Sequence, residues 1–416
     1  MVHASIAYFG VFVLSSSDVL GVDGVRESLD VLVDGGEPWR NIRSGDRFAC
    51  VTLDWWPNDK YSSNPGAHYP WVNASILNLD LTEPMLTEAL EALAPVRLRV
   101  GGSLADQIYY SGTGENEDDN PSSCAEPMAN ASMILGYGQG CITASRLDAL
   151  LALCANSHAE LVFGLNGLYG RAPAPSTTEL WTGPWNATNA EGLLRHIHTL
   201  YDESSSPLVA VELGNEIDGA AGINAKLPPA TYASDFVTLR SLLTNIWPGK
   251  GPLLVGPDYS GFSDSWWYPQ FLGNLTSLSK NGSVSDYLDV ISWHLYLLGS
   301  GNSSAVPGKI LDATVLNSLA TKCQLHHSTV VSYGGNGEPP QFWLGEGGGA
   351  YGSGQDGSTN SFLSTFWFAD SLGTLAAQGH DSFCRQVCAS LKSGHVNNLN
   401  FVFHLTHTLL LLFVRR

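Results

Sequence analysis

The chain alternates between short apolar runs and longer amphipathic stretches, and this alternation restricts its fold more than any other feature. Eight apolar runs occur, at 48–54, 96–100, 160–166, 208–216, 252–257, 289–296, 340–346 and 381–387. Stretches with helical periodicity separate most of them, at 83–94, 143–153, 190–201, 231–247, 311–323 and 361–377. Apolar runs that alternate with helices are typical of a parallel sheet buried on both faces. Eight such units favour a closed barrel over an open sheet, so we expect an α/β fold, a (β/α)8 TIM barrel, over residues 48–387.

The two ends of the chain lie outside this alternation. Residues 6–14 form a short apolar run, followed by three serines, that resembles a signal peptide, although no Lys or Arg precedes it. We expect a signal segment and an N-terminal extension over 1–47, with one short strand at 29–33. The apolar run at 401–414 is shorter than the roughly 20 residues that a membrane span needs. We therefore expect 388–416 to be a divergent tail without a domain of its own.

Charge and composition limit the kinds of molecule that the protein can bind. The 416 residues include 39 acidic and 20 basic side chains, for a net charge of −19. This balance opposes binding to nucleic acid or to an anionic membrane through surface charge, so an acidic substrate must be held by a few local donors. Seven cysteines permit three disulfides with one thiol left over, and none has zinc-ligand spacing. Six Asn-x-Ser/Thr acceptors predict a glycosylated, secreted protein, and neither metal nor cofactor is expected.

Two glutamates end predicted strands. Glu216 follows Asn215 at the end of the fourth run, and Glu346 ends the seventh. The carboxyl ends of barrel strands gather on one reactive face, so these side chains are expected to meet there. Hydrolysis of a glycosidic bond requires one carboxylic acid and one carboxylate, and a desolvated Glu216 suits the acid while Glu346 suits the nucleophile. The alternative is that both glutamates are solvated loop residues.

Three motifs carry a resemblance to a known family. They are Glu-Leu-Gly-Asn-Glu at 212–216, Trp-Leu-Gly-Glu-Gly-Gly-Gly-Ala-Tyr at 343–351 and Cys-Arg-Gln at 384–386. Together with shorter matches at 53–57, 75–81, 97–102 and 294–296, they make residues 48–386 similar to the heparanase-related glycoside hydrolases of family 79, in particular the plant heparanase-like proteins.

The resemblance implies a retaining β-glucuronidase-type hydrolase on a (β/α)8 barrel. Glu216 is then the proton donor and Glu346 the nucleophile, and the backbone of Tyr351, Gly352 and Ser353 matches the stretch whose amides hold the sugar carboxylate. Amides are suited to this task because they bind an anion without adding cations. The implied partner is a glycan or glycoside that contains glucuronic acid.

Four further positions match residues around the sugar in that family: Asp54, Asn215, Tyr296 and Gln386. Each leaves a structural alternative open. Asp54 and Asn215 could serve only to cap or orient, Tyr296 could belong to the core, and Gln386 could be an ordinary strand residue. We expect His294 to pack beside the cleft rather than to take part in catalysis.

The sequence departs from the family after Gln386. The strand end that resembles Gly-Gly-Asn-Tyr and the β-sandwich that follows it in the family are not recognisable, so the sandwich is expected to be largely missing. Two alternatives to a β-glucuronidase therefore stay open: an inactive, truncated isoform that binds sugars or partners, and a glycosidase for neutral sugars. Secretion to the extracellular space or cell wall is expected, with the lysosome or vacuole and peripheral membrane association as alternatives.

Overall fold

The computed structural model describes residues 47–60, 71–114, 124–129, 136–175, 180–219, 225–261, 266–334 and 339–386. The predicted signal segment, the predicted strand at 29–33 and the divergent tail lie outside these residues. Among the described residues, no helix combines the length and apolar character needed to cross a membrane.

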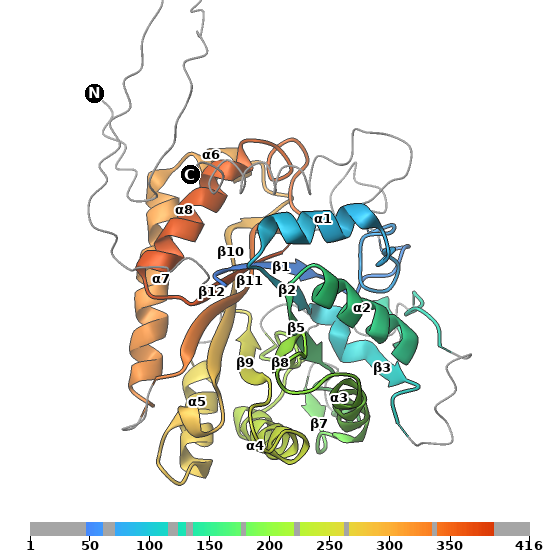
Figure 1. Cartoon of the computed structure of the whole chain (residues 1–416). Helices are drawn as coiled ribbons and strands as arrows, with labels where there is room; N and C mark the ends of the chain where they lie inside the picture. The colour runs from blue at the N-terminus through green and yellow to red at the C-terminus, as the bar shows by residue number, and fades with distance from the viewer. Residues whose placement is uncertain are drawn as a thin grey trace, which may run out of the picture.

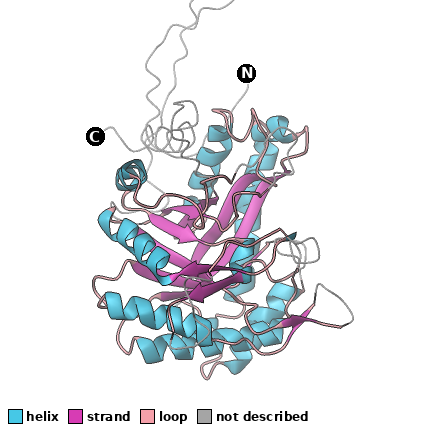
Figure 2. Cartoon of the chain, turned by 90° about the vertical axis from the view of Figure 1, so that its right-hand side faces the viewer, coloured by secondary structure: helices cyan, strands magenta, loops and turns pink. Residues whose placement is uncertain are grey.

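Eight parallel strands close into a barrel, which confirms the predicted fold class (Figure 1, Figure 2). Each predicted apolar run contributes one strand. The order around the barrel is β1, β12, β11, β10, β9, β8, β5 and β2. Their bounds are Ala49–Leu53 (β1), Arg97–Val100 (β2), Glu160–Leu165 (β5), Leu208–Leu213 (β8), Leu253–Tyr259 (β9), Val290–Ser300 (β10), Gln341–Tyr351 (β11) and Ser382–Gln386 (β12).

Helices surround the barrel on its outer face (Figure 1). Local sequence signals explain where three of these helices begin. Pro84 occupies the first turn of α1. The side chains of Thr143 and Asp312 accept backbone N–H groups at the starts of α2 and α7. Six helices correspond to predicted ones: α1 (Pro84–Leu93), α2 (Ala144–Asn156), α3 (Thr188–Leu200), α4 (Pro229–Ile246), α7 (Ala313–Val331) and α8 (Ser364–Ala377).

Several elements were not predicted. Helix α5 (Trp267–Leu278) completes the unit after β9, α6 (Val306–Ile310) precedes α7, and α7 runs eight residues beyond its predicted end at 323. Two small strand pairs lie outside the barrel, and two short 3₁₀ helices complete the described elements. These are β3 (Ile108–Ser111) with β4 (Gly140–Thr143), β6 (Ala172–Pro173) with β7 (Trp181–Thr182), η1 (Ser103–Gln107) and η4 (Val284–Asp286).

The barrel interior has an apolar layer, and the next layer toward the strand ends holds Glu212 and Ser292 among small residues. Val162, Ala210, Val255, Val290 and Trp343 form a separate buried cluster, one residue from each of five strands. Side chains alternate along a strand, so the residues two positions further along also face inward. These are Gly164, Glu212, Pro257, Ser292 and Gly345, followed by the strand ends where a site can form.

Two disulfides occur among the described residues. Cys50 and Cys384 join the neighbouring strands β1 and β12, and Cys124 pairs with Cys141. Cys154 and Cys323 are free and buried.

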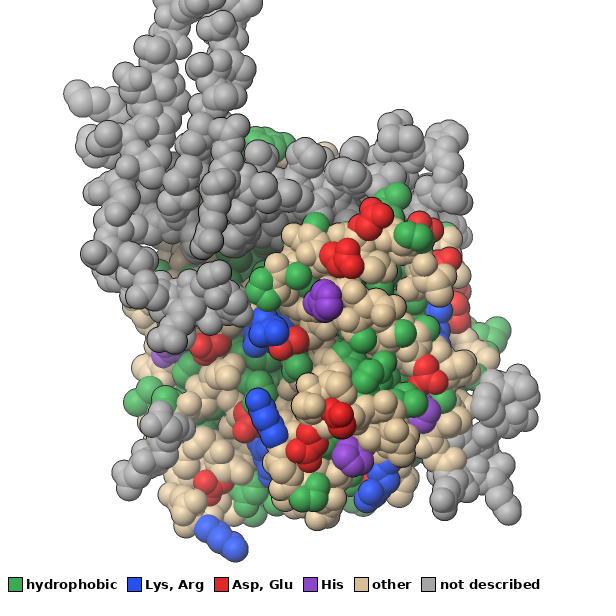
Figure 3. All heavy atoms as spheres, viewed as in Figure 1, with side chains coloured by type: hydrophobic (Ala, Val, Ile, Leu, Met, Phe, Trp, Pro, Cys, Tyr) green, Lys and Arg blue, Asp and Glu red, His purple; other side chains and the backbone are tan. Residues whose placement is uncertain are grey.

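On the face shown in Figure 3, acidic and basic side chains are scattered among neutral ones and form no continuous basic patch.

Candidate active site

Glu216 lies in the loop just beyond β8, three residues after the strand ends at Leu213. Its φ is 52°, a left-handed backbone conformation that costs roughly 1–3 kcal/mol in a residue other than glycine and that concentrates at functional sites. The Glu216 N–H donates to the carbonyl oxygen of Asp258 at 2.8 Å, which holds this loop against the end of β9. The side chain is buried.

Glu346 lies within β11 and not at its end, which corrects the prediction. The strand continues for five residues because β10 and β11 keep pairing, through Gly299 with Ala350 and Ser300 with Tyr351. His294 is paired with Glu346, and the register of β11 shifts against both neighbouring strands around this position.

The two glutamates meet at the carboxyl ends of the barrel strands. One carboxylate oxygen of Glu216, one of Glu346 and one ring nitrogen of His294 all lie within 4.8 Å of one another. All three side chains are buried. The two carboxyl groups therefore lie close enough to act on one glycosidic bond.

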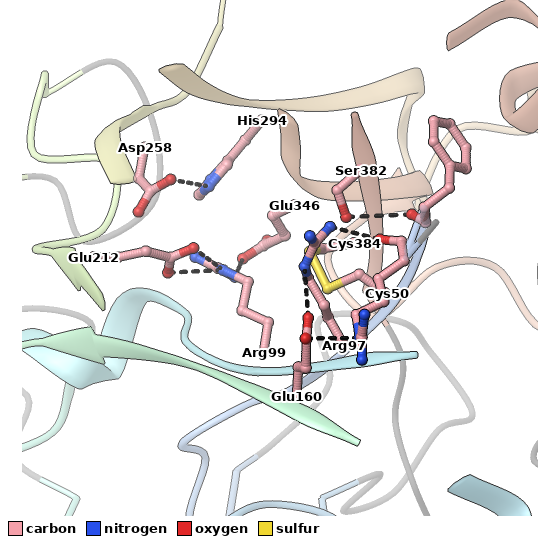
Figure 4. The surroundings of a disulfide bond; sticks show 12 residues. Cys50, Arg97, Arg99, Glu160, Glu212, Asp258, His294, Glu346, Ser382 and Cys384 are labelled. Atoms are coloured by element: carbon pink, nitrogen blue, oxygen red, sulfur yellow. Dashed lines mark hydrogen bonds and ion pairs between the residues drawn. A yellow bond between two sulfur atoms is a disulfide. The ribbon is translucent and has the colours of Figure 1, made fainter. Parts of the chain in front are cut away.

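Arg99, on β2, connects the polar groups of the barrel interior (Figure 4). Its Nε donates to both carboxylate oxygens of Glu212 at 2.9 and 2.8 Å, and its Nη1 donates to Glu346 at 2.9 Å. Its Nη2 donates to the Asn215 side-chain oxygen at 3.1 Å. Burial opposes the charge on Arg99, but the carboxylates of Glu212 and Glu346 more than compensate and raise its pKa. Arg99 therefore orients Glu346 and Asn215 through hydrogen bonds from the barrel interior.

Glu346 is kept ionised by its surroundings. Burial alone would raise its pKa, but the charges of His294 and Arg99 and a hydrogen bond from Tyr296 together lower it. The Tyr296 hydroxyl donates to Glu346 Oε1 at 2.6 Å. A glycine run gives Tyr296 room: a side chain at Gly348 would place its Cβ 2.4 Å from the Tyr296 ring.

His294 joins Glu216 to a buried aspartate. Its Nδ1 lies 2.9 Å from Glu216 Oε1, and its Nε2 lies 3.6 Å from Asp258 Oδ1 (Figure 4). Burial lowers the pKa of His294, but Asp258, Glu216 and Glu346 outweigh it and raise the pKa to about 10. The Ser292 hydroxyl donates to Asp258, whose pKa is held below its usual range by His294 and Arg99 despite burial. The His294 ring therefore links Glu216 to Asp258, with one ring nitrogen toward each.

Asp54 and Gln386 form a second pair of predicted site residues. Gln386 Nε2 donates to Asp54 Oδ2 at 2.6 Å, across the neighbouring strands β1 and β12. Burial and the charge of Glu346 raise the pKa of Asp54 to about 7. Asp54 is therefore tied to Gln386 by a hydrogen bond and to Glu346 by charge.

The remaining predicted residues differ in how closely they are tied to the carboxyl pair. Asn215 is buried, and its N–H donates to Asp106 at 2.9 Å while its side chain contacts Arg99. The Tyr351 ring lies edge to face with Tyr296, at a centroid distance of 6.2 Å. Gly352 and Ser353 follow in an exposed turn, both with positive φ.

Sequence reasoning did not assign Arg99, Glu212 and Asp258 to the site, and it placed His294 beside the site only. Glu212 lies inside an otherwise apolar strand, and Arg99 lies in a short strand that also carries Arg97; both occupy inward-facing positions of the alternation. A charged residue at such a position must have a buried partner, and this signal could have found the pair. Asp258 follows Pro257 at a strand end, and no pattern in the sequence indicates that it faces His294.

Comparisons with known proteins identify the family of the chain. The family model "Glycosyl hydrolase family 79, N-terminal domain" matches residues 29–373. Heparanase-like protein 1 of Arabidopsis thaliana is 31% identical over 386 residues, which is 92% of this chain and 65% of that protein. Baicalin-beta-D-glucuronidase of Scutellaria baicalensis is 29% identical over 358 residues, 83% of this chain and 63% of that protein.

A solved structure shares the fold. It is the 4-O-alpha-L-rhamnosyl-beta-D-glucuronidase of Fusarium oxysporum, with a TM-score of 0.54 and 15% identity over 82% of this chain and 63% of that one. The chain spans 61–65% of the length of the heparanase-like proteins that it matches. From the matched family model, which covers most of the barrel, the chain belongs to glycosyl hydrolase family 79.

Proposed function

We propose that the protein is a retaining glycoside hydrolase that cleaves β-glucuronosyl linkages in glycans or glycosides. The approach of the Glu216 and Glu346 carboxylate oxygens to within 4.8 Å carries this proposal. Retaining enzymes keep their two carboxyl groups about 5–5.5 Å apart, whereas inverting enzymes leave roughly 6.5–9.5 Å for a water molecule. The short approach supports retention.

In the first step, Glu346 attacks the anomeric carbon while Glu216 donates its proton to the departing glycosidic oxygen. A bond forms between Glu346 and the sugar, and the bond between the sugar and the leaving group breaks. Arg99 and Tyr296 hold the two oxygens of Glu346, so the nucleophile is ionised and fixed in orientation before the substrate arrives. In the second step, water attacks the sugar, Glu216 accepts its proton and Glu346 leaves as a carboxylate.

His294 and Asn215 support this cycle as positioning residues. The hydrogen bond between His294 and Glu216 fixes the carboxyl that must give and then take a proton. The backbone N–H of Asn215 donates to Asp106, and its side-chain oxygen accepts from Arg99. These two bonds fix Asn215 next to Glu216 in the chain. We further propose that the sugar carboxylate is bound by the amides of Tyr351, Gly352 and Ser353, and that Asp54 and Gln386 contact the sugar hydroxyls.

Hydrolysis of an aryl β-glucuronide by the full chain tests the proposal. We expect Glu346→Gln and Glu216→Gln to lower kcat on the order of a thousandfold or more, because each removes a group that bonds to the reacting atoms. Glu88→Gln is the matched control, since Glu88 is exposed on the outer helix α1. Equal rates for the wild type and Glu346→Gln would remove Glu346 from the mechanism.

Two further readouts define the reaction. NMR of the sugar released in the first turnovers should show the β-anomer, and the α-anomer would contradict retention. An aryl β-glucoside should be a poorer substrate than the glucuronide, and a preference for the glucoside would instead support the neutral-sugar glycosidase.

We also propose that the protein is secreted and glycosylated. Of the acceptor asparagines, Asn73, Asn186, Asn281 and Asn302 are exposed and Asn274 is half-buried. The disulfide between Cys50 and Cys384 fits an oxidising compartment. A loss of apparent mass after enzymatic removal of N-glycans from protein expressed in plant cells would support this, and an unchanged mass would oppose it.

A further inference from the structure

A tight turn directly after β8 carries the candidate proton donor. It consists of Gly214, Asn215 and Glu216. Gly214 and Glu216 both have left-handed backbone conformations, with φ of 68° and 52°. A residue other than glycine keeps such a conformation only where its surroundings hold it. The anchors of this turn therefore decide where the carboxyl of Glu216 lies.

Each backbone N–H of the turn is bonded to a different segment of the chain. The first and the last donate to backbone carbonyl oxygens, of Leu165 at the end of β5 and of Asp258 in β9, both at 2.8 Å. The N–H of Asn215, in the middle, donates to Oδ2 of Asp106 in η1 at 2.9 Å. Of these three anchors, only the one at Asn215 depends on a side chain, so it alone can be removed by a substitution.

The carboxylate of Asp106 also holds the loop that follows β5. Its second oxygen, Oδ1, accepts the N–H of Gly167 at 2.7 Å. The two loops are in close contact, since a Cβ on Gly167 would lie 3.0 Å from the Cα of Gly214. Asp106 is 3% exposed, so water cannot readily replace either bond. One buried carboxylate thus clamps together two backbone segments whose spacing sets the position of the turn.

We propose that Asp106 is a positioning residue for the proton donor, and that it acts by clamping the turn at Asn215 against the loop at Gly167. This proposal rests on the proposed function, because it assigns a further residue to the same reaction. A carboxylate suits the task, because its hydrogen bonds are stronger than those of a neutral oxygen and both of its oxygens accept.

The clamp acts on one half of the catalytic pair. Asp106 bonds to the backbone next to Glu216, whereas the side chain of Glu346 is held by Arg99 and Tyr296. Loss of the clamp should therefore weaken proton donation more than nucleophilic attack. A poor leaving group needs the proton and an activated one departs without it, so the two effects can be told apart.

The test is kcat/KM for a series of aryl β-glucuronides whose leaving phenols differ in acidity. Asp106→Asn keeps the shape of the side chain but turns an NH₂ group toward one of the two N–H donors, so at most one bond survives. It should lower kcat/KM roughly tenfold or more for weakly acidic phenols, and less than about threefold for the most acidic one. Asp202→Asn is the matched control: Asp202 also accepts two backbone N–H groups, from Ser204 and Ser205, but it is exposed and precedes β8.

A double variant separates positioning from a general loss of structure. In Glu216→Ala the clamp has no proton donor to place, so adding Asp106→Asn should change kcat/KM by less than about twofold. An undiminished further loss overturns the proposal, as does an equal loss for every phenol or a change below about twofold for Asp106→Asn alone. If Asp106→Asn fails to melt cooperatively, Gly167→Ala tests the same clamp from its other side. A loss that is independent of the phenol, or no loss, then overturns the proposal equally.

Hydrogen exchange of the peptide that contains Asn215 tests the clamp without turnover. Its amide exchange should be faster in Asp106→Asn than in the wild type and unchanged in Asp202→Asn. Unchanged exchange in Asp106→Asn overturns the proposal. A wild type that hydrolyses no β-glucuronide refutes the proposed function, and faster exchange in Asp106→Asn then still leaves the clamp standing.

Discussion

The hydroxyl of Tyr296 should set the pH at which the enzyme loses activity in acid. Its hydrogen bond to Glu346 is short, at 2.6 Å, and half-buried. Burial and the charge of Glu346 hold the pKa of Tyr296 well above its usual range, so the hydroxyl remains a donor throughout the working pH range. Tyr296→Phe deletes this one oxygen and keeps the ring that packs edge to face with Tyr351.

The size of the effect follows from the contacts of Glu346. A hydrogen bond to a charged group contributes about 1.5–3 kcal/mol, and about 1.4 kcal/mol corresponds to one pKa unit. Arg99 and His294 remain in the variant and still lower the pKa of Glu346. We therefore expect a rise of about one unit, at the low end of that range. The nucleophile must be ionised, so activity falls as the pH drops through its pKa, and a raised pKa moves this loss to higher pH.

The assay is kcat/KM for an aryl β-glucuronide across the acidic pH range. Tyr296→Phe should shift the acidic limb upward by about one pH unit and lower the plateau roughly tenfold or more, because the freed carboxylate is also less well oriented. Tyr287→Phe is the control, since its hydroxyl donates at 2.7 Å to the neutral carbonyl of Leu278 at an exposed position. An acidic limb and plateau within about twofold of the wild type would refute the assignment of Tyr296 as the residue that tunes Glu346.

Three further predictions follow from the same contacts. Arg99→Leu leaves buried carboxylates without their cation and should lower the free energy of unfolding by about 3–5 kcal/mol in chemical denaturation, whereas Arg195→Leu, on an exposed helix, should change it by less than about 1 kcal/mol. Glu216→Ala should slow substrates with poor leaving groups far more than activated aryl glucuronides, and an equal loss for both would contradict its role as proton donor. The pKa of His294 is raised to about 10, so the stability that its protonated form contributes is complete below its ordinary pKa of 6.5 and is lost as the pH rises through 10. The stability deficit of His294→Gln should therefore be largest near pH 6 and shrink toward pH 10 in thermal melts, and a deficit independent of pH would argue against the imidazolium.

The position in the fold could be predicted for Glu216, because it follows a strong strand. Glu216 was expected at the end of its strand and lies three residues past Leu213. Glu346 was also placed at a strand end, but β11 continues to Tyr351 because β10 extends alongside it. A strand's length beyond the barrel depends on its neighbour, and the pairing of β10 with β11 joins residues about fifty positions apart. Local propensity contains no such information.

The sequence by itself determined the eight-unit barrel, because apolar runs and helical patterns are local and each unit must bury its apolar surface against the next. It also singled out Glu216 and Glu346 as candidates for the catalytic roles, since one follows and the other lies within a buried apolar run. Only the tertiary structure decided how those carboxyls are oriented and how Glu346 is charged. The pKa of Glu346 depends on Arg99 and His294, which come from two further strands and converge through closure of the barrel. Electrostatic interactions act through space over a few ångströms in a buried environment, so their partners are fixed by the packing of distant segments.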